Sequence, residues 1–260
     1  MKVLLWSSFK MKILVANDDG IYSHGLLALA NALADLGDVF IVAPEFEQSG
    51  VGHGITIRRP LRFKPTVLEG LHPNIKAYRV DGTPTDCVVM GVHRLGKPDL
   101  VVSGINYGPN LGYDLTHSGT FACAIEGTHI GIPSIAFSQS FANAMDYTHS
   151  AAFARVIAQQ ILEHGLPNKT VLNVNIPSGI PKGVRVTVQG THHYEDNVAE
   201  RQDPDGKNYY WIGGVATGDS EADSDYTALE QGFISVTPLH LDFTDRGYLQ
   251  KLRGFLAQSL

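Results

Sequence analysis

The stretch KILVANDDGIYSHG, residues 12–25, decides the fold of this chain. Its apolar run, Lys12–Ala16, predicts a short buried strand that stops at two adjacent aspartates, Asp18 and Asp19. In a continuing strand, neighbouring side chains point to opposite faces. The two carboxylates can therefore converge on one point only where the strand ends, and Gly20 permits the sharp turn that this requires.

The residues after this stretch predict a strand–helix–strand unit. Leucines recur at helical spacing between residues 26 and 36, and Gly37 suits the end of the helix. Residues 39–44 then predict a second buried strand. Short joints between these elements indicate parallel strands with a right-handed crossover.

The same alternation of strands and helices continues to about residue 176. Further buried strands are expected at residues 99–105, 133–138 and 170–177, helices at 83–96, 118–131 and 150–164, and strand-like pieces at 54–59 and 77–80. The helix at 83–96 is marked by Thr83 as N-cap, Pro84 in the first turn and Asp86 in a capping box. The core is therefore predicted to be α/β, a doubly wound, mostly parallel, Rossmann-like sheet.

The character of the chain changes after the predicted core. Several strand-like segments show no core of their own and are expected to project as β-hairpin arms, with a turn at Asp205-Gly206. A second start at Met11 suggests that the first ten residues are a non-native or disordered extension. We divide the chain into four parts: this extension, residues 1–10; the α/β core, residues 11–182; the arms, residues 183–245; and a C-terminal helix, residues 246–260.

Composition limits the classes of function. The 260 residues are 43% hydrophobic and 18% charged, with a net charge of −6, which disfavours duplex nucleic acid as a partner. No apolar run is long enough to span a membrane. Cys87 and Cys123 cannot form a disulfide framework and are expected to be buried, reduced thiols of a cytoplasmic protein. The acidic run at residues 219–225 is expected to be a solvated turn, with a secondary ion site as the alternative.

Oxygen-bearing side chains follow three of the predicted strands. Asp18 and Asp19 follow the first buried strand, Ser49 follows the second, and Asn106 follows the third. Ligands bind outside the carboxyl ends of such strands, and all-oxygen ligand sets suit Mg²⁺, Mn²⁺ or Ca²⁺. A turn with a helix N-cap at the aspartates, and an ordinary loop at Ser49, remain the alternative interpretations.

A second motif points to phosphate. A glycine-rich loop at residues 103–120 joins a strand to a helix that opens with Ser118, Gly119 and Thr120. Free N–H groups at such a helix start bind phosphate, although the ending of a Walker loop is absent. A divalent ion beside this helix would polarise a phosphoryl oxygen and lower the pKa of a bound water. A glycine-rich surface loop with a capped helix is the alternative.

These motifs resemble those of the survival protein E (SurE) nucleotidases. The matching blocks, in order, are ILVANDDGI, APEFEQSG, VDGTPTDCV, PDLVVSGINYGPNLGYDLTHSGT, LNVNIP, DPDGKNYYWIGG and ISVTPLHLDFTD. The resemblance implies a cytoplasmic, metal-dependent 5′-nucleotidase, a hydrolase that also accepts nucleoside 3′-monophosphates. It further implies a homodimer or homotetramer with exchanged arms, and one Mg²⁺ or Mn²⁺ per subunit, with Ca²⁺ able to replace it in a crystal.

The resemblance also implies roles for single residues. Its metal ligands fall on Asp18, Asp19, Ser49 and Asn106, its catalytic residues on Asp18, Asp19 and Asn106, and its phosphate contacts on Ser118, Gly119 and Thr120. Whether a metal-activated hydroxide or the Asp19 carboxylate attacks phosphorus stays open.

Two positions depart from the family pattern. Basic residues are common just before the Ser-Gly of the second block, but Phe46, Glu47 and Gln48 stand there. A tyrosine is common where His117 stands, and this histidine either contacts phosphate or replaces a packing group. Two other classes of function remain alternatives: a nucleotide-binding regulatory module, and an oligomeric scaffold without turnover.

Overall fold

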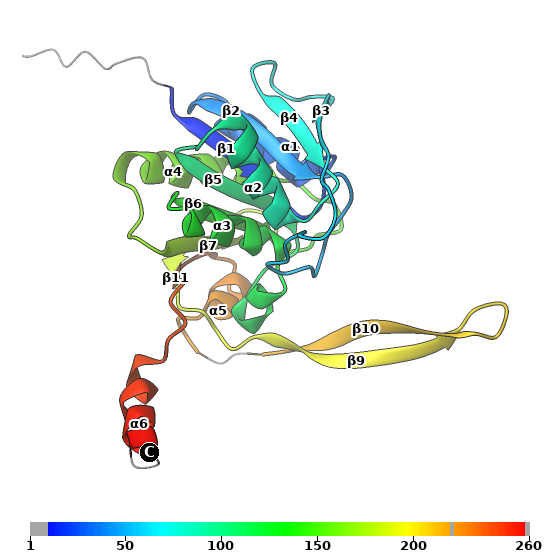
Figure 1. Ribbon diagram of the computed structural model, residues 1–260, viewed down its shortest axis with the longest axis vertical. Helices are drawn as coiled ribbons and strands as arrows, with labels where there is room; N and C mark the ends of the chain where they lie inside the picture. The colour runs from blue at the N-terminus through cyan, green and yellow to red at the C-terminus, as the bar shows by residue number, and fades with distance from the viewer. Residues whose placement is uncertain (1–9, 219–220, 258–260) are drawn as a thin grey trace, which may run out of the picture.

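The computed structural model describes residues 10–218 and 221–257 and is built on a nine-stranded sheet (Figure 1). In spatial order the strands are β3 (Phe63–Thr66), β4 (Lys76–Val80), β2 (Asp38–Pro44), β1 (Lys12–Ala16), β5 (Leu100–Tyr107), β6 (Ser134–Gln139), β7 (Thr170–Ile176), β11 (Ile234–His240) and β8 (Val184–Val186). Only the β3–β4 and β11–β7 pairs are antiparallel in this sheet. The prediction of a doubly wound, mostly parallel sheet is confirmed.

Helices cover both faces of the sheet. The described helices are α1 (His24–Leu33), α2 (Pro84–Leu95), α3 (Gly119–His129), α4 (Thr148–His164), α5 (Asp225–Glu230) and α6 (Arg246–Ala257), with a 3₁₀ turn, η1 (Gly112–Thr116). Helices α1 and α4 pack together on one face, and α2 and α3 on the other. None of the described helices is long and apolar enough to cross a membrane.

The alternation of side chains in β1 explains why this strand lies at the centre. Ile13 and Val15 point into the cluster that includes α1 and α4, whereas Leu14 and Ala16 point into the cluster that includes α2 and α3. All four side chains are buried. Complete burial of an aliphatic side chain of this size contributes about 1.5–3 kcal/mol, so β1 is held from both faces.

The strand order places a topological switch point beside β1. The chain first moves from β1 to β2 on one side, and later returns to β5 on the other side. The connection that leaves β1 leads to one side of the sheet and the connection that leaves β5 leads to the other. In such sheets this divergence leaves a crevice at the carboxyl ends of the two strands. The segments that carry Asp18, Asp19 and Asn106 therefore meet at this point.

Two predicted helices can be compared with the structure in detail. The predicted cap of α2 is confirmed, because the side chains of Thr83 and Asp86 accept each other's backbone N–H. The helix expected to reach residue 36 ends instead at Leu33. The chain leaves it in a turn because it must return to β1, where Asp38 N donates to Met11 O at 2.7 Å.

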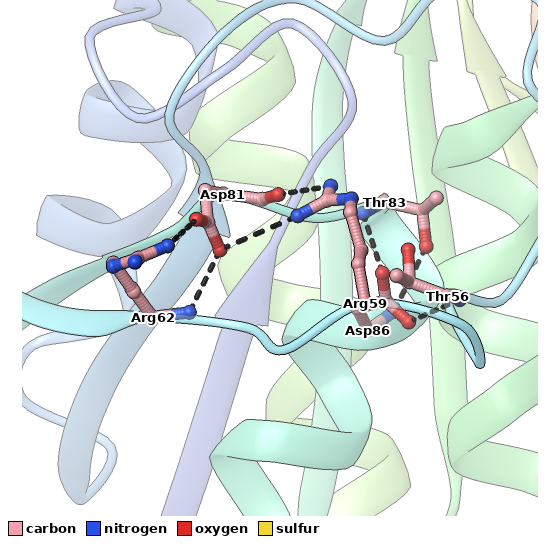
Figure 2. Close-up of polar contacts among 6 residues, drawn as sticks. All are labelled: Thr56, Arg59, Arg62, Asp81, Thr83 and Asp86. Atoms are coloured by element: carbon pink, nitrogen blue, oxygen red, sulfur yellow. Dashed lines mark hydrogen bonds and ion pairs between the residues drawn. The ribbon is translucent and has the colours of Figure 1, made fainter.

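The strand-like piece at residues 54–59 is wrong, because this segment does not pair with the sheet. Its backbone is held by the start of α2 instead (Figure 2). Thr56 N donates to Asp86 Oδ1 at 2.9 Å, and Thr83 Oγ1 donates to Gly54 O at 2.8 Å. Farther along, Arg59 donates to the backbone carbonyl of Asp81 (Figure 2). Point contacts, rather than a ladder, fix this loop.

The predicted arm region, residues 183–245, needs a correction. β8 and β11 belong to the main sheet, and only β9 (His193–Gln202) and β10 (Asn208–Thr217) form a projecting hairpin (Figure 1). β11 joins the sheet because Ile234 and Val236 are buried in the core and the strand pairs with β7. The turn predicted at Asp205-Gly206 does join β9 to β10.

The ends of the chain are only partly described. Of the predicted extension, residues 1–9 lie outside the described residues. The C-terminal helix is present as α6, which stands away from the sheet and buries none of its residues (Figure 1); residues 258–260 of the prediction lie outside the described part.

The acidic run is not a fully solvated turn. Residues 219–220 lie outside the described part, but Asp225 is buried. Its carboxylate accepts N–H groups from Gly112 and Gly190, each at 3.0 Å. This aspartate therefore ties the base of the hairpin to η1. The sequence did not predict this role, because both partners are far away from Asp225 in the sequence.

Candidate active site

The chain turns sharply where β1 ends. Asn17 Nδ2 donates to Gly20 O at 3.0 Å and to Ser23 Oγ at 2.9 Å, which ties the turn to the start of α1. Gly20 has φ +94°, a backbone conformation that favours glycine. The strand ends at its aspartates as the sequence predicts, and both carboxylates lie beside the switch point.

Asp18, Asn106 and Thr120 are brought together. Thr120 Oγ1 donates a short hydrogen bond to Asp18 Oδ1. The hydroxyl oxygen of Thr120 also lies 3.3 Å from Asn106 Oδ1. Asp18 and Thr120 are buried, whereas Asn106 is half-buried. One hydroxyl of α3 thus joins side chains that follow β1 and end β5.

Gly119 allows this close approach of α3 to β1. A Cβ atom at residue 119 would lie 2.7 Å from Asp18 Cβ and 3.0 Å from Asp18 Oδ2. The first distance is shorter than real Cβ contacts and the second is tight, so an alanine side chain would force Asp18 or the helix start to shift. Packing against the buried carboxylate is therefore a reason for glycine at the helix start.

Asp19 and Asn106 are oriented by backbone groups. Asp19 is half-buried, and its Oδ2 accepts a hydrogen bond from Tyr107 N at 3.2 Å. Asn106 Nδ2 donates to Gly108 O at 2.8 Å, which leaves the amide oxygen on the side of Thr120. Both side chains present oxygen atoms to the same end of the sheet.

Ser49 lies on a neighbouring loop. Its side chain is exposed, and Ser49 Oγ donates to Glu47 Oε1 at 2.8 Å. The loop is tied to the site by Gln48 N, which donates to Asp18 O at 2.8 Å. Among the described residues, no hydrogen bond joins the Ser49 hydroxyl to the two aspartates, so the structure brings Ser49 near the site through its backbone neighbour.

The two carboxylates have raised pKa values. Burial raises the pKa of Asp18, against the opposing effect of the Thr120 hydroxyl. Burial, together with the charge of Asp18, raises the pKa of Asp19 to about 7. Adjacent buried carboxylates are costly without a cation, and every donor here is an oxygen. These residues therefore fit a hard divalent ion.

The start of α3 is polarised. Ser118 is its N-cap, and its Oγ accepts a hydrogen bond from Phe121 N at 3.1 Å. The backbone N–H groups of Gly119 and Thr120 act on Asp18 and oppose the rise in its pKa that burial causes. These N–H groups and the positive end of the helix dipole favour anions at this point. His117 is exposed, and its carbonyl accepts from Gly52 N at 2.9 Å.

A pocket of about 370 Å³ opens beside Asp19, which is an adequate volume for a small ligand. Its other lining residues are Ser23, His24, Glu47, Tyr107, Met145 and Tyr147. The Tyr107 ring is exposed and packs edge-on against Phe141, with ring centroids 5.1 Å apart. Tyr107 and Tyr147 form an aromatic rim of the pocket. The sequence did not predict this aromatic rim, and its one local signal is that Tyr107 directly follows Asn106.

Comparison with known proteins identifies the family. The family model described as Survival protein SurE matches residues 13–196. The chain belongs to the SurE family. A 5′-nucleotidase SurE 1 of Thermus thermophilus is 57% identical to this SurE-family chain, over 95% of the chain and 98% of the relative. A 5′-nucleotidase SurE of Deinococcus radiodurans is also 57% identical, over 94% and 92%.

A solved structure agrees with this assignment to the SurE family. The crystal structure of the SurE protein from Aquifex aeolicus matches the chain with a TM-score of 0.80 and 42% identity. The match covers 94% of this chain and 99% of that one. The family resemblance predicted from the sequence motifs is thus confirmed over nearly the whole SurE fold.

The raised pKa of Asp19 predicts how stability depends on pH in the metal-free SurE-family chain. Folded Asp19 keeps its proton up to about pH 7, whereas the unfolded chain releases it near 3.8. The folded state binds more protons between these values, so the free energy of unfolding should fall as the pH rises from about 4 to about 7. Urea denaturation with a chelator measures this slope. Asp19→Asn should flatten it and the exposed Asp223→Asn should not; equal slopes in both variants would contradict the assignment.

Proposed function

We propose that this chain is a divalent-metal-dependent phosphomonoesterase that hydrolyses nucleoside 5′-monophosphates, and also 3′-monophosphates, to nucleoside and phosphate. One observation carries the proposal. A buried carboxylate, an amide oxygen and the start of α3 are joined through the Thr120 hydroxyl at the switch point of the sheet. The names of the relatives, 5′-nucleotidase, support the same activity.

One Mg²⁺ or Mn²⁺ per subunit would be held by Asp18, Asp19, Ser49 and Asn106. When bound, such an ion polarises a phosphoryl oxygen and lowers the pKa of a coordinated water. The oxygen-only donor set and the raised pKa values of both carboxylates support this assignment. Ser49 would join the set by rotating its exposed hydroxyl away from Glu47.

The start of α3 would bind the phosphate group. Ser118, Gly119 and Thr120 lie at the positive end of the helix, where N–H groups stabilise the charge that redistributes over the phosphoryl oxygens. Thr120 is also a positioning residue, since its hydroxyl bonds to Asp18 and lies beside Asn106. The same helix would thus orient both the substrate and the ligands.

The pocket beside Asp19 would hold the nucleoside. It combines aromatic surface from Tyr107 and Tyr147 with polar groups such as His24. A nucleobase can stack on an exposed aromatic ring, and such stacking is worth about 1–3 kcal/mol per base. The position next to a predicted metal ligand supports a nucleotide rather than a smaller phosphate ester as the substrate.

Phosphate release from a panel of nucleoside monophosphates tests the function. We expect release with Mg²⁺ or Mn²⁺ and none with EDTA. Asp18→Asn should lower kcat/KM at least about a hundredfold, because it removes a charge that holds the ion. The exposed Asp223→Asn is the matched control and should retain activity. Binding of nucleotides without any release would instead favour a regulatory module.

Removal of the Tyr107 ring should affect nucleotides selectively. Tyr107→Ala keeps the backbone N–H that bonds to Asp19, so the ligand geometry is preserved. We expect KM for the preferred nucleotide to rise about tenfold, in line with the loss of one stacking contact. Values of kcat/KM for glycerol phosphate, which has no base, should not change, and Tyr107→Phe should behave as wild type. Equal losses with both substrates would exclude a role in base binding.

We also propose that the protein is a homodimer or homotetramer with exchanged arms. The projecting hairpin exposes Trp211 and Ile212, and α6 exposes Leu252 and Phe255. Apolar surface of this extent on projecting elements usually marks an interface. A partner subunit would cover it.

Light scattering after size-exclusion chromatography tests this assembly. Ile212→Lys on the hairpin and Phe255→Lys on α6 should each lower the measured mass, because a charge would be buried at the interface. Val67→Lys provides the control, since Val67 is 95% exposed outside both arms. A wild-type mass equal to one chain would refute the proposal.

The thiols support a location in the cytoplasm, which we propose for this chain. Cys87 and Cys123 are free and buried. Burial raises the pKa of both thiols, which keeps them protonated and unreactive. Unpaired cysteines are typical of reducing compartments.

A further inference from the structure

A second group of side chains that can bind a metal lies outside the oxygen-rich site formed by Asp18, Asp19, Asn106 and the start of α3. It consists of His53, Glu126 and His129, and one donor atom from each side chain lies within 4.8 Å of the others. Glu126 and His129 are three residues apart on α3, a spacing that places both on one face of a helix. His53 comes from the loop that follows Ser49. Two separate elements therefore contribute to the cluster.

The geometry of the cluster is close to that of an ion site. His53 Nε2 lies 2.9 Å from Glu126 Oε2, and the rings of His53 and His129 have centroids 5.7 Å apart. Ligand atoms lie about 2.0–2.2 Å from a zinc ion, so any two of them are at most about 4.4 Å apart. Both histidines are exposed, and small rotations of their side chains bring all three donors within that range.

The cluster is separate from the oxygen-rich site. Glu126 is seven residues after Gly119, which corresponds to about 10 Å along a helix axis. His53 and His129 also border a cavity of about 380 Å³, whose lining includes Ser118. Water can reach the cluster through this cavity, as a site with three protein ligands requires.

We propose that His53, Glu126 and His129 bind one divalent transition-metal ion of the Zn²⁺ class. Two imidazoles with one carboxylate suit Zn²⁺, Co²⁺ or Ni²⁺, whereas Mg²⁺ prefers oxygen ligands. A helical Glu-x-x-His pair is a known way to present such ligands from one face. The ion of this site differs in chemistry from the one expected at Asp18.

The ion would cross-link two parts of the proposed active site. The loop that carries His53 also carries Ser49, and Gly52 N of this loop donates to the carbonyl oxygen of His117, the residue after η1, at 2.9 Å. Helix α3 carries Glu126 and His129 at one end and Ser118–Thr120 at the other. An ion bound between them fixes the position of the loop relative to the helix start. Its role is structural, and it binds at the C-terminal end of α3.

Cobalt binding to the full-length chain tests the site, because the visible absorption of Co²⁺ reports the coordination number and ligand field of the bound ion. Wild type should bind Co²⁺ at this site, and His129→Ala should lose that absorption and one equivalent of bound ion. Asp18→Asn should retain it, which separates this site from the oxygen-rich one. His164→Ala, which removes another histidine from the last turn of a helix, is the matched control. The same stoichiometry and spectrum in His129→Ala as in wild type would overturn the proposal.

Thermal unfolding with Zn²⁺ gives a second readout. Zn²⁺ should raise the Tm of wild type and of His164→Ala, because an ion that binds only the folded state stabilises it. It should raise the Tm of Glu126→Gln less than that of wild type, because only the oxygen-rich site at Asp18 remains to bind an ion. This variant preserves the shape of the side chain and its ability to bond to His53, so it decides the question if His129→Ala does not fold. An unaltered zinc effect in Glu126→Gln would also reject the site. None of these readouts depends on nucleotide hydrolysis, so a failure here is distinct from a failure of the proposed function.

Discussion

The burial of the Asp18 carboxylate is the constraint on which the site depends. This side chain is only 3% exposed, and an isolated buried charge would be very costly. Three features of α3 compensate for it: the hydroxyl of Thr120, the N–H groups at the helix start and the absence of a side chain at Gly119. The helix cannot move away from β1 without leaving that carboxylate unpaired. The proposed phosphate-binding helix is thus held in place by the same group that is proposed to bind the metal.

The doubly wound sheet makes this arrangement possible. β1 is fixed by apolar side chains on both of its faces, so Asp18 and Asp19, which follow it, are carried by a rigid support. β5 lies beside it in parallel register and delivers Asn106 to the same edge. The oxygen donors of Asp18, Asn106 and Thr120 then meet on rigid supports, whereas Ser49 comes from an irregular loop. Such preorganisation lowers the entropic cost of binding an ion and a substrate.

The sequence predicted those features that depend on near neighbours or on strand polarity. The capping box of Thr83 and Asp86 needs only a few adjacent residues, and the meeting of Asp18 with Asn106 follows from parallel strands. The irregular structure of residues 54–59 and the burial of Asp225 could not be predicted. The segment is held by Asp86, and Asp225 binds the N–H of Gly112; both partners are far away in the sequence. The aromatic rim was missed for the same reason: Tyr107 and Tyr147 meet only after β5 and the start of α4 have been placed.

The loop between β2 and β3 is the part of the site that most needs restraint. It has no regular structure around Ser49, and ordering each such residue costs about 1–2 kcal/mol of backbone entropy. Its backbone is held at every fourth residue. Gln48 N donates to Asp18, Gly52 N donates to the residue after η1, and Thr56 N donates to a side chain of α2. His53 lies within this series, and its bond to Glu126 adds a contact to α3. Replacing that exposed hydrogen bond by coordination to the proposed ion would strengthen the link between the loop and α3. Ser49 then lies between two fixed points of the loop, Gln48 and His53, which set its position relative to the start of α3.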